Sequence, residues 1–301
     1  MSLRQWKNVV SRAAQDINNN HALSFAAALA YYCVISLFPA LITLAALVSL
    51  LPIPNLFQNL ITVIGRVVPG ESMGLLNHVV ADVIRPHSSG LLSFGVLGSL
   101  WTVSSGFCEL IEALDVAYDV PETRSLIKTR LLAVWLAILV GGMLIISVIC
   151  MTAGPHLLWM FADKLGIGGE FIFIWKYARW AIAGVLVVLS IEAIYFLAPN
   201  VKQCFWNTLP GALIAIVSWG LLSAGLGFYF TKYAHLNKTY GTLGGGIALL
   251  VWLYWTGFVV IVGGELNSEI IQERDGGTLP LKQPPPERVK PVPADSTQLA
   301  A

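Results

Sequence analysis

The chain has 301 residues, of which 56% are hydrophobic and only 12% are charged, and its formal net charge is +1. Soluble domains carry roughly 25% charged residues, so this composition and the mean hydropathy of +0.72 exclude an ordinary soluble domain. The near-neutral balance lacks the basic excess of nucleic-acid-binding proteins, and no nucleic-acid partner is expected.

Residues 1–21 predict an amphipathic helix on the cytoplasmic membrane surface. The apolar residues that share one helical face are Leu3, Trp6, Val10, Ala13 and Ile17. A helix with such a face lies in the membrane interface. The apolar run that follows is too long for the core of a cleavable signal peptide.

A six-span transmembrane domain is predicted over residues 22–271. The spans cover about residues 22–51, 91–107, 131–153, 180–198, 210–230 and 240–264. Each has about the length that crosses a hydrocarbon core. Backbone groups cannot stay unpaired in lipid, so the spans must be helices. The predicted fold class is therefore all-α, a polytopic bundle of six transmembrane helices.

Two further segments flank or interrupt these spans. The loop after the first span repeats apolar residues at helical spacing, such as Leu56 and Leu60 before Gly70 and Val79 and Val83 after it. This pattern predicts amphipathic helices in the first outer loop. Residues 272–301 are proline-rich and polar, which predicts a disordered cytoplasmic tail.

Lys and Arg residues give the expected orientation. With the N-terminus inside, 11 of the 18 Lys and Arg residues fall in inner segments and 7 in outer ones. Basic residues are enriched in cytoplasmic loops. Six spans would then place both termini in the cytoplasm.

The glycine run in "TYGTLGGGIALL", residues 239–250, first looks like a phosphate-binding loop. A dinucleotide fingerprint needs a third glycine where this chain has Leu249, and a Walker loop needs a Lys that is absent here. No charged side chain follows from Gly241 to Gly264. The run therefore opens a membrane helix, and its small residues let another helix approach closely.

Glu192 is the main candidate for a functional residue because it lies inside the fourth predicted span. Acids within a membrane are costly and usually face a cavity or a partner. One hypothesis makes Glu192 a proton or cation site, or an anchor for a polar substrate. The other makes it a structural carboxylate, neutral or paired, that fixes helix packing. The sequence leaves both open.

Other residues are candidates for a substrate or ion cavity. In the first span they are Tyr31, Tyr32 and Pro39, and around the sixth span they are Tyr240, Gly241, Glu265 and Asn267. Pro39 in mid-helix removes a backbone hydrogen bond and favours a kink. Glu265 and Glu269 share a helix face, and at the cytoplasmic interface we expect them to be solvated.

A stripe of acids follows the second span. It comprises Glu109, Glu112, Asp115 and Asp119, and the basic residues that come next are Arg124, Lys128 and Arg130. A solvated or salt-bridged face is favoured over a cation vestibule here.

No pattern for catalysis, a cofactor or a metal is found. The four cysteines form no C-x-x-C pair, and the five histidines lack ligand spacing. Neither a nucleophile elbow nor an H-E-x-x-H motif is present. We therefore expect no enzyme activity, no cofactor and no metal.

Three motifs carry a resemblance to a known family. They are "ALAYYCVISLFPALI", "YFLAPN" and "YGTLGGGIALLVWLYWTGFVVIVGGELNSE". Over residues 5 to 272 the chain resembles the YihY/BrkB family of bacterial inner-membrane proteins. The resemblance implies six spans, cytoplasmic termini and the bacterial plasma membrane. Members were once labelled ribonuclease BN, a label considered a misassignment.

These observations favour a transporter or a lipid- or amphiphile-translocating protein with a cavity between helices. The alternative is a non-transporting scaffold for envelope organisation or partner binding. A membrane-associated ribonuclease or other enzyme is the least favoured. The expected partners are membrane lipids and a lipid or amphiphile substrate, and a homo-oligomer or an envelope protein partner stays open.

Overall fold

The computed structural model describes residues 3–49, 61–63, 65, 68–74, 89–165, 169–234, 242–275 and 280–282. Regular structure there is helical apart from one isolated bridge between Val201 and Leu281, which confirms the all-α class. The elements are α1 (Leu3–Asn19), α2 (Ala22–Ser49), η1 (Gly70–Ser72), α5 (Ser89–Ala117), α6 (Leu126–Leu165), α7 (Gly169–Leu197), α8 (Phe205–Tyr229), η2 (Phe230–Ala234) and α10 (Thr242–Asp275).

Some predictions fall outside the described residues. Tyr240 and Gly241 lie there, as do most of the first outer loop and the tail beyond Lys282. The outer amphipathic helices and the disordered tail therefore stay predictions. The prediction of a disordered tail from residue 272 is wrong for residues 272–275, which belong to α10, and for Leu281 and Lys282, which pair with Val201 and Asn200.

α1 confirms the predicted N-terminal helix, and its predicted apolar face is partly exposed and partly packed against the protein. Val9 and Ala13 are buried, whereas Trp6 is 37% and Val10 53% exposed. α1 packs mainly against α10, so this contact decides which residues are covered. The chain then bends by 65° between α1 and α2. His21 at the bend has a φ of 52°, in the left-handed region that few residues other than glycine adopt.

Several helices are long and apolar enough to cross a membrane. Within the described residues four qualify, namely Leu126–Met151, Tyr177–Leu197, Phe205–Tyr233 and Leu243–Arg274, and the bent α1–α2 pair adds a fifth if it is one span. These match the third to sixth predicted spans and the first. The second predicted span lies in α5, which forms as a helix but is not among those that qualify. The polytopic membrane class is confirmed, and the count of six stays a prediction.

Large apolar side chains cover the outside of the membrane helices. Exposed examples are Trp135 on α6, Trp180 and Val185 on α7, and Val217 and Leu221 on α8. Such a continuous apolar exterior is unfavourable in water. It is the surface expected of a protein surrounded by lipid.

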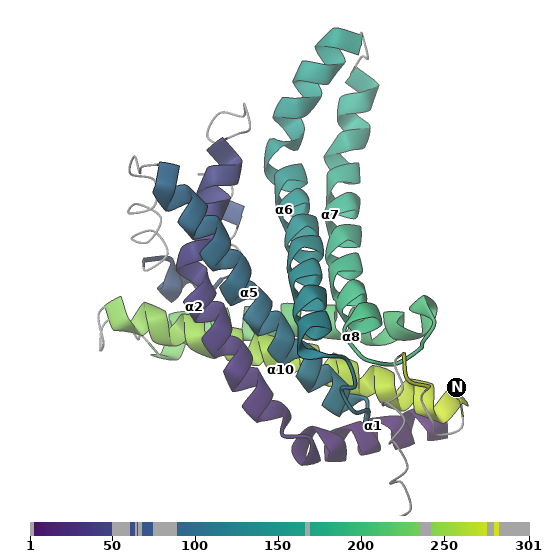
Figure 1. Cartoon of the computed structure of the whole chain (residues 1–301). Helices are drawn as coiled ribbons and strands as arrows, with labels where there is room; N and C mark the ends of the chain where they lie inside the picture. The colour runs from purple at the N-terminus through teal and green to yellow at the C-terminus, as the bar shows by residue number, and fades with distance from the viewer. Residues whose placement is uncertain are drawn as a thin grey trace, which may run out of the picture.

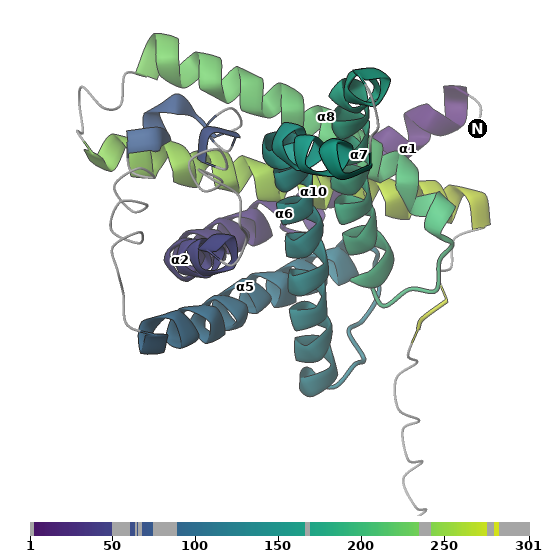
Figure 2. The ribbon, with the colours of Figure 1, turned by 90° about the horizontal axis from the view of Figure 1, so that it is seen from above.

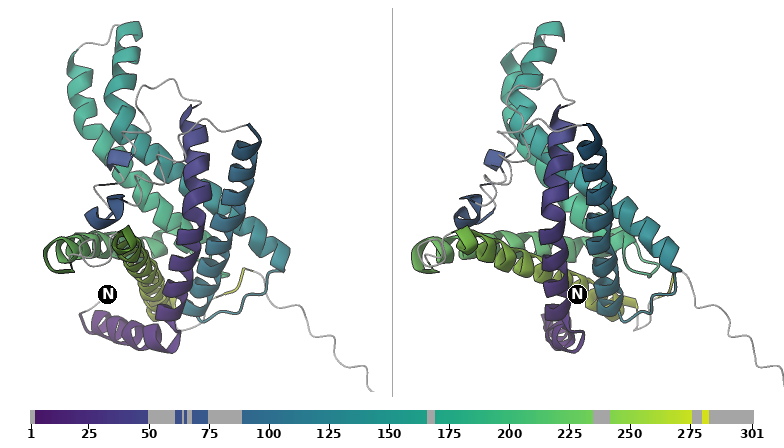
Figure 3. Two further views of the ribbon diagram at one scale, coloured as in Figure 1. Left: turned by 90° about the vertical axis from the view of Figure 1, so that its left-hand side faces the viewer. Right: turned by 60° about the vertical axis from the view of Figure 1, so that its left-hand side comes forward.

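The helices pack in three pairs. α6 and α7 form a long hairpin that projects beyond the other helices (Figure 1). α2 packs against α5, and α8 runs beside α10 (Figure 2). The α8–α10 pair crosses α2, α5 and the α6–α7 hairpin at a steep angle (Figure 3). Because α10 contacts α1, α2, α5 and α8, it is the central helix.

Glycines in α10 allow this close packing, as the sequence predicted. A Cβ added at Gly245 would lie 2.7 Å from the Glu71 carbonyl oxygen, too close for ordinary contact. Added Cβ atoms at Gly263 and Gly264 would overlap Tyr195 and Leu114 respectively. α10 therefore approaches its neighbours at distances that only glycine permits.

Candidate functional site

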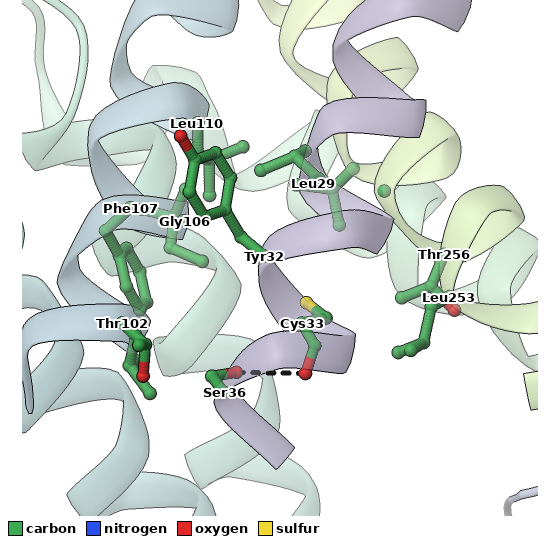
Figure 4. A pocket seen from close by; sticks show the side chains of 14 residues that line it. Leu29, Tyr32, Cys33, Ser36, Thr102, Gly106, Phe107, Leu110, Leu253 and Thr256 are labelled. Atoms are coloured by element: carbon green, nitrogen blue, oxygen red, sulfur yellow. Dashed lines mark hydrogen bonds between the residues drawn. The ribbon is translucent and has the colours of Figure 1, made fainter. Parts of the chain in front are cut away.

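An apolar cavity of about 190 Å³ lies between α2, α5 and α10. Leu29 and Cys33 of α2, Phe107 and Leu110 of α5, and Leu253 of α10 line it (Figure 4). Pockets that hold a whole small-molecule ligand measure roughly 300–1,000 Å³. The cavity is therefore suited to part of an apolar chain.

Three of the hydroxyl groups in the cavity lining, those of Ser36, Thr102 and Thr256, are bonded within their own helices. Ser36 donates to the Cys33 carbonyl at 3.0 Å, as Figure 4 shows. Thr102 donates to the Gly98 carbonyl at 2.9 Å. Thr256 donates to the Trp252 carbonyl at 2.8 Å. With these donors occupied, the cavity presents mostly apolar surface to an occupant.

The three candidate residues of the first span have different positions relative to this cavity. Tyr32 lines it (Figure 4), whereas Tyr31 is 59% exposed on the outside of α2. Pro39 is not part of the lining. α2 continues through Pro39, and the Thr43 hydroxyl donates to its carbonyl at 3.0 Å. Of the three, only Tyr32 is placed in the cavity wall.

A second site, entirely polar, joins α8 to α10 near the end of the bundle at which α1 lies. The fully buried Asn267 accepts a hydrogen bond from the Gly211 N–H at 2.8 Å. Its amide also donates to the Thr208 carbonyl at 2.8 Å. These contacts lie on either side of Pro210, which has no N–H to donate. Asn267 thus satisfies backbone groups of a neighbouring helix.

Glu192 belongs to the same polar region. It lies on α7, five residues before the helix ends at Leu197, and it is fully buried. The Thr208 hydroxyl donates to Glu192 Oε1, while Glu192 Oε2 is buried without a hydrogen-bond partner. Asn267 and Glu192 are therefore linked through Thr208.

The acids at the end of α10 dock α1. The Asn20 amide donates to Glu265 at 2.9 Å, and Arg12 bonds to Glu269 at 2.5 Å and to Glu273 at 2.7 Å. The expectation of solvated acids was wrong for Glu265 and Glu269, which are 1% and 4% exposed. α1 covers them, a contact between the two ends of the chain that helix periodicity does not reveal.

The acidic stripe after α5 forms a salt-bridged cluster through Asp115. Arg124 bonds to Asp115 at 3.2 Å and to Glu122 at 2.7 Å. The Asn200 N–H donates to Asp115 at 2.7 Å. Burial raises the pKa of Asp115 to about 7, although Asn200 and Arg124 act in the opposite direction. The predicted pairing with Arg124 is confirmed for Asp115.

Arg130 is placed differently from the predicted acid–base pairing. Its guanidinium lies 4.1 Å from the centre of the Trp101 ring. It also donates to the Trp101 carbonyl and to Ser105, both at 3.0 Å. Arg130 therefore ties the start of α6 to α5 by a cation–π contact.

A pocket of about 530 Å³ opens beside the loop between α7 and α8. Lys202, Gln203, Cys204, Asn207 and Lys282 are among its lining residues. The Lys282 ammonium donates to the carbonyls at the end of α7, including Phe196 at 2.9 Å. Burial, with a smaller contribution from the charge of Arg124, lowers the pKa of Lys282 to about 8.

Comparison with known proteins identifies the family. Residues 13–288 match the family model for virulence factor BrkB. The chain belongs to the BrkB family. It is 32% identical over 245 residues to the ribonuclease-like protein YfkH of Bacillus subtilis (strain 168), covering 81% of this chain and 88% of YfkH. No solved structure matches it.

Other BrkB relatives carry membrane-protein names. The chain is 26% identical over 285 residues to a UPF0761 membrane protein of Xanthomonas axonopodis pv. citri (strain 306), covering 89% of this chain and 64% of that protein. It is 24% identical over 270 residues to a UPF0761 membrane protein of Rhodospirillum centenum, covering 89% and 58%. The chain thus spans less than two thirds of these relatives. It is an integral membrane protein of this family.

The side chains around Glu192 were not predictable from sequence patterns. Tyr118 follows α5, Gln203 precedes α8 and Thr208 lies in the first turn of α8. They belong to three segments, and no spacing along the chain connects them to Glu192. The available signal was the cluster of polar residues at helix ends, which is also typical of ordinary loops.

Proposed function

We propose that this BrkB protein binds a lipid or another amphiphile in the bacterial inner membrane and moves it between the leaflets. The observation that carries the proposal is the apolar cavity between α2, α5 and α10, in which the Ser36, Thr102 and Thr256 hydroxyls are bonded within their own helices. An aqueous ion would find few free polar groups there, whereas an acyl chain needs none. The volume of about 190 Å³ fits part of such a chain.

The surface helix α1 supports the same proposal. Its exposed Trp6 and Val10 lie outside the packed core, where an interfacial helix contacts lipid headgroups and upper acyl chains. In this proposal both chain termini lie in the cytoplasm, as the distribution of Lys and Arg indicates.

Photocrosslinking tests whether lipid enters the cavity. Protein in vesicles of bacterial polar lipids receives a phospholipid with a diazirine on its acyl chain, and the adducts are mapped by mass spectrometry. We expect adducts on cavity residues such as Cys33 and Leu253, in addition to adducts on exterior residues such as Trp135. Adducts confined to the exterior would contradict lipid binding in the cavity.

A matched pair of substitutions on α5 tests transport. Val103 lines the cavity, whereas Leu97 is 69% exposed. We expect Val103→Trp to abolish transfer of a fluorescent phospholipid between leaflets of these vesicles, and Leu97→Trp to preserve it. Equal transfer in protein-free vesicles and with the wild-type protein would reject translocation.

The competing proposal is a scaffold that organises envelope proteins without transport. It predicts a stably co-purifying protein and no effect of Val103→Trp on lipid transfer. The name ribonuclease-like belongs to the relative YfkH. In the described part of the chain, no group of three His, Cys, Asp or Glu side chains is placed to hold a metal ion, and no observation there favours RNA cleavage.

A further inference from the structure

Three buried polar atoms without hydrogen-bond partners belong to one region of the bundle. They are the Tyr118 hydroxyl, Glu192 Oε2 and Gln203 Oε1. Tyr118 and Glu192 are 1% and 0% exposed, and the three side chains come from different parts of the chain. Buried polar groups are normally paired, and each exception calls for a physical explanation.

Gln203 bonds to the carbonyl of Tyr195, which lies three residues after Glu192 on α7, so Gln203 lies beside the segment that carries Glu192. Burial raises the pKa of the Tyr118 phenol, the charge of Glu192 raises it further, and the side chains of Asn267 and Gln203 lower it. Tyr118 therefore lies within interaction range of both Glu192 and Gln203. The Gln203 amide donates to the Tyr195 carbonyl at 2.6 Å, which fixes the orientation of its unpartnered oxygen.

Among the described residues, no basic side chain forms an ion pair with Glu192, so nothing there compensates its charge. The salt bridges of the described residues join Arg12 to the α10 acids and Arg124 to Asp115 and Glu122. The one side-chain donor that reaches Glu192 there is the Thr208 hydroxyl. Burying an unpaired carboxylate is so unfavourable that such a group usually takes up a proton or a cation.

The number of hydrogen-bond donors and acceptors at the site supports a bound proton. With Glu192 ionised, the Tyr118 hydroxyl is the only donor of the three groups, and Glu192 Oε2 and Gln203 Oε1 both require one. A proton on Glu192 Oε2 adds a donor and removes the charge. Each of the three groups can then be paired without any further ligand. A metal cation would also compensate the charge, but in the described part of the chain no group of three His, Cys, Asp or Glu side chains is placed to hold one, so we favour the proton.

We propose that Glu192, Tyr118 and Gln203 form a proton-binding site in which Glu192 is the carboxyl that takes up and releases the proton. This proposal does not rest on lipid translocation. The two sites are nevertheless connected in structure, because Ile194, two residues after Glu192 on α7, lines the apolar cavity. A proton bound at Glu192 would therefore act on a helix that contributes to the cavity wall.

The groups around the site are few. The ionisable side chains are Tyr118 after α5, Tyr195 on α7 itself, and Glu265 of α10, which interacts with Tyr118. α8 contributes the Thr208 hydroxyl and α10 also contributes the Asn267 amide. The residues of α6 in this core are apolar: Ala133, Leu136 and Val140.

The pocket beside the α7–α8 loop supplies the route for the proton. Gln203 is part of the pocket lining and also one of the three unpartnered groups. Gln203 therefore belongs both to the lining of this pocket, of about 530 Å³, and to the proposed site. We expect protons to enter and leave from the end of the bundle at which α1 lies.

Infrared difference spectroscopy on the full chain in lipid vesicles tests the site. Stepping the pH should give a protonated-carboxyl C=O band that is lost in Glu192→Gln. The same band should persist but shift in frequency in Tyr118→Phe, which keeps the carboxyl and removes one neighbour. Glu109→Gln, at an acid on α5 outside the site, should leave the band unchanged.

Two outcomes would overturn the proposal. One is a set of carboxyl bands identical in the wild-type protein and a correctly folded Glu192→Gln variant. The other is a change at Glu192 that depends on added sodium ions at constant pH, which would make the bound cation a metal ion. Neither result depends on lipid transfer. The proton-site proposal can therefore fail while the proposed function holds, and the proposed function can fail while the proton site holds.

Discussion

Asn267 of α10 accepts a hydrogen bond from the backbone N–H of Gly211 of α8 at 2.8 Å, within a fully buried contact. A Cβ on Gly211 would overlap the Asn267 side chain. The glycine and the asparagine are thus required together, because the first leaves the space that the second fills. This contact fixes the crossing of α8 and α10, from which the polar region around Glu192 is built.

We expect Asn267→Leu to destabilise the protein by about 2–3 kcal/mol, because it leaves the Gly211 N–H and the Thr208 carbonyl buried with fewer partners. Unfolding in mixed detergent micelles measures the change. Asn207→Leu is the control, since Asn207 makes an exposed contact with Arg274. Equal stability of the two variants would show that the Asn267 contact does not hold the helices together.

Gly263→Ala should destabilise the α7–α10 contact by about 1–3 kcal/mol, the usual cost of overpacking. The added methyl group would overlap the Tyr195 hydroxyl and lie 2.9 Å from the Ala215 Cβ. Gly220→Ala on α8 is the matched control, because no atom lies within 4 Å of its added Cβ. Thermal unfolding compares them, and a double variant with Tyr195→Phe should recover part of the loss.

Arg12→Gln should release α1 from α10, because Arg12 joins both Glu269 and Glu273. We expect limited proteolysis to cleave α1 several-fold faster in this variant than in the wild-type protein. Arg4→Gln changes an exposed residue at the start of the same helix and should leave the rate unchanged. Similar rates in all three proteins would mean that apolar packing alone docks α1.

Lys282 should make stability depend on pH in the alkaline range. Burial lowers its pKa from 10.5 to about 8 in the folded protein. Between these values the unfolded chain binds more protons than the folded one, so the free energy of unfolding rises as the pH rises from about 8 to 10.5. Unfolding curves across this range should show a smaller rise in Lys282→Met. A parallel pH dependence in both proteins would contradict this role.

The lining of the apolar cavity shows how far the sequence could predict a site. The pattern around "YYCV" placed Tyr31 and Tyr32 together as candidates, yet one is 59% exposed and the other lines the cavity. Adjacent residues on a helix point about 100° apart. Which of the two faces inward depends on where α5 and α10 pack, and local sequence does not contain that information.

The sequence by itself determined the membrane class, the helical content and the family, because long uncharged runs must form helices in lipid. It also singled out Glu192 and Asn267, since polar groups are rare in such runs. Only the tertiary structure decided that Thr208 bonds to Glu192, that Tyr118 and Gln203 lie close by, and that α1 covers Glu265 and Glu269. These contacts join segments far apart in the chain, and they depend on helix crossings that hydropathy and periodicity leave undetermined.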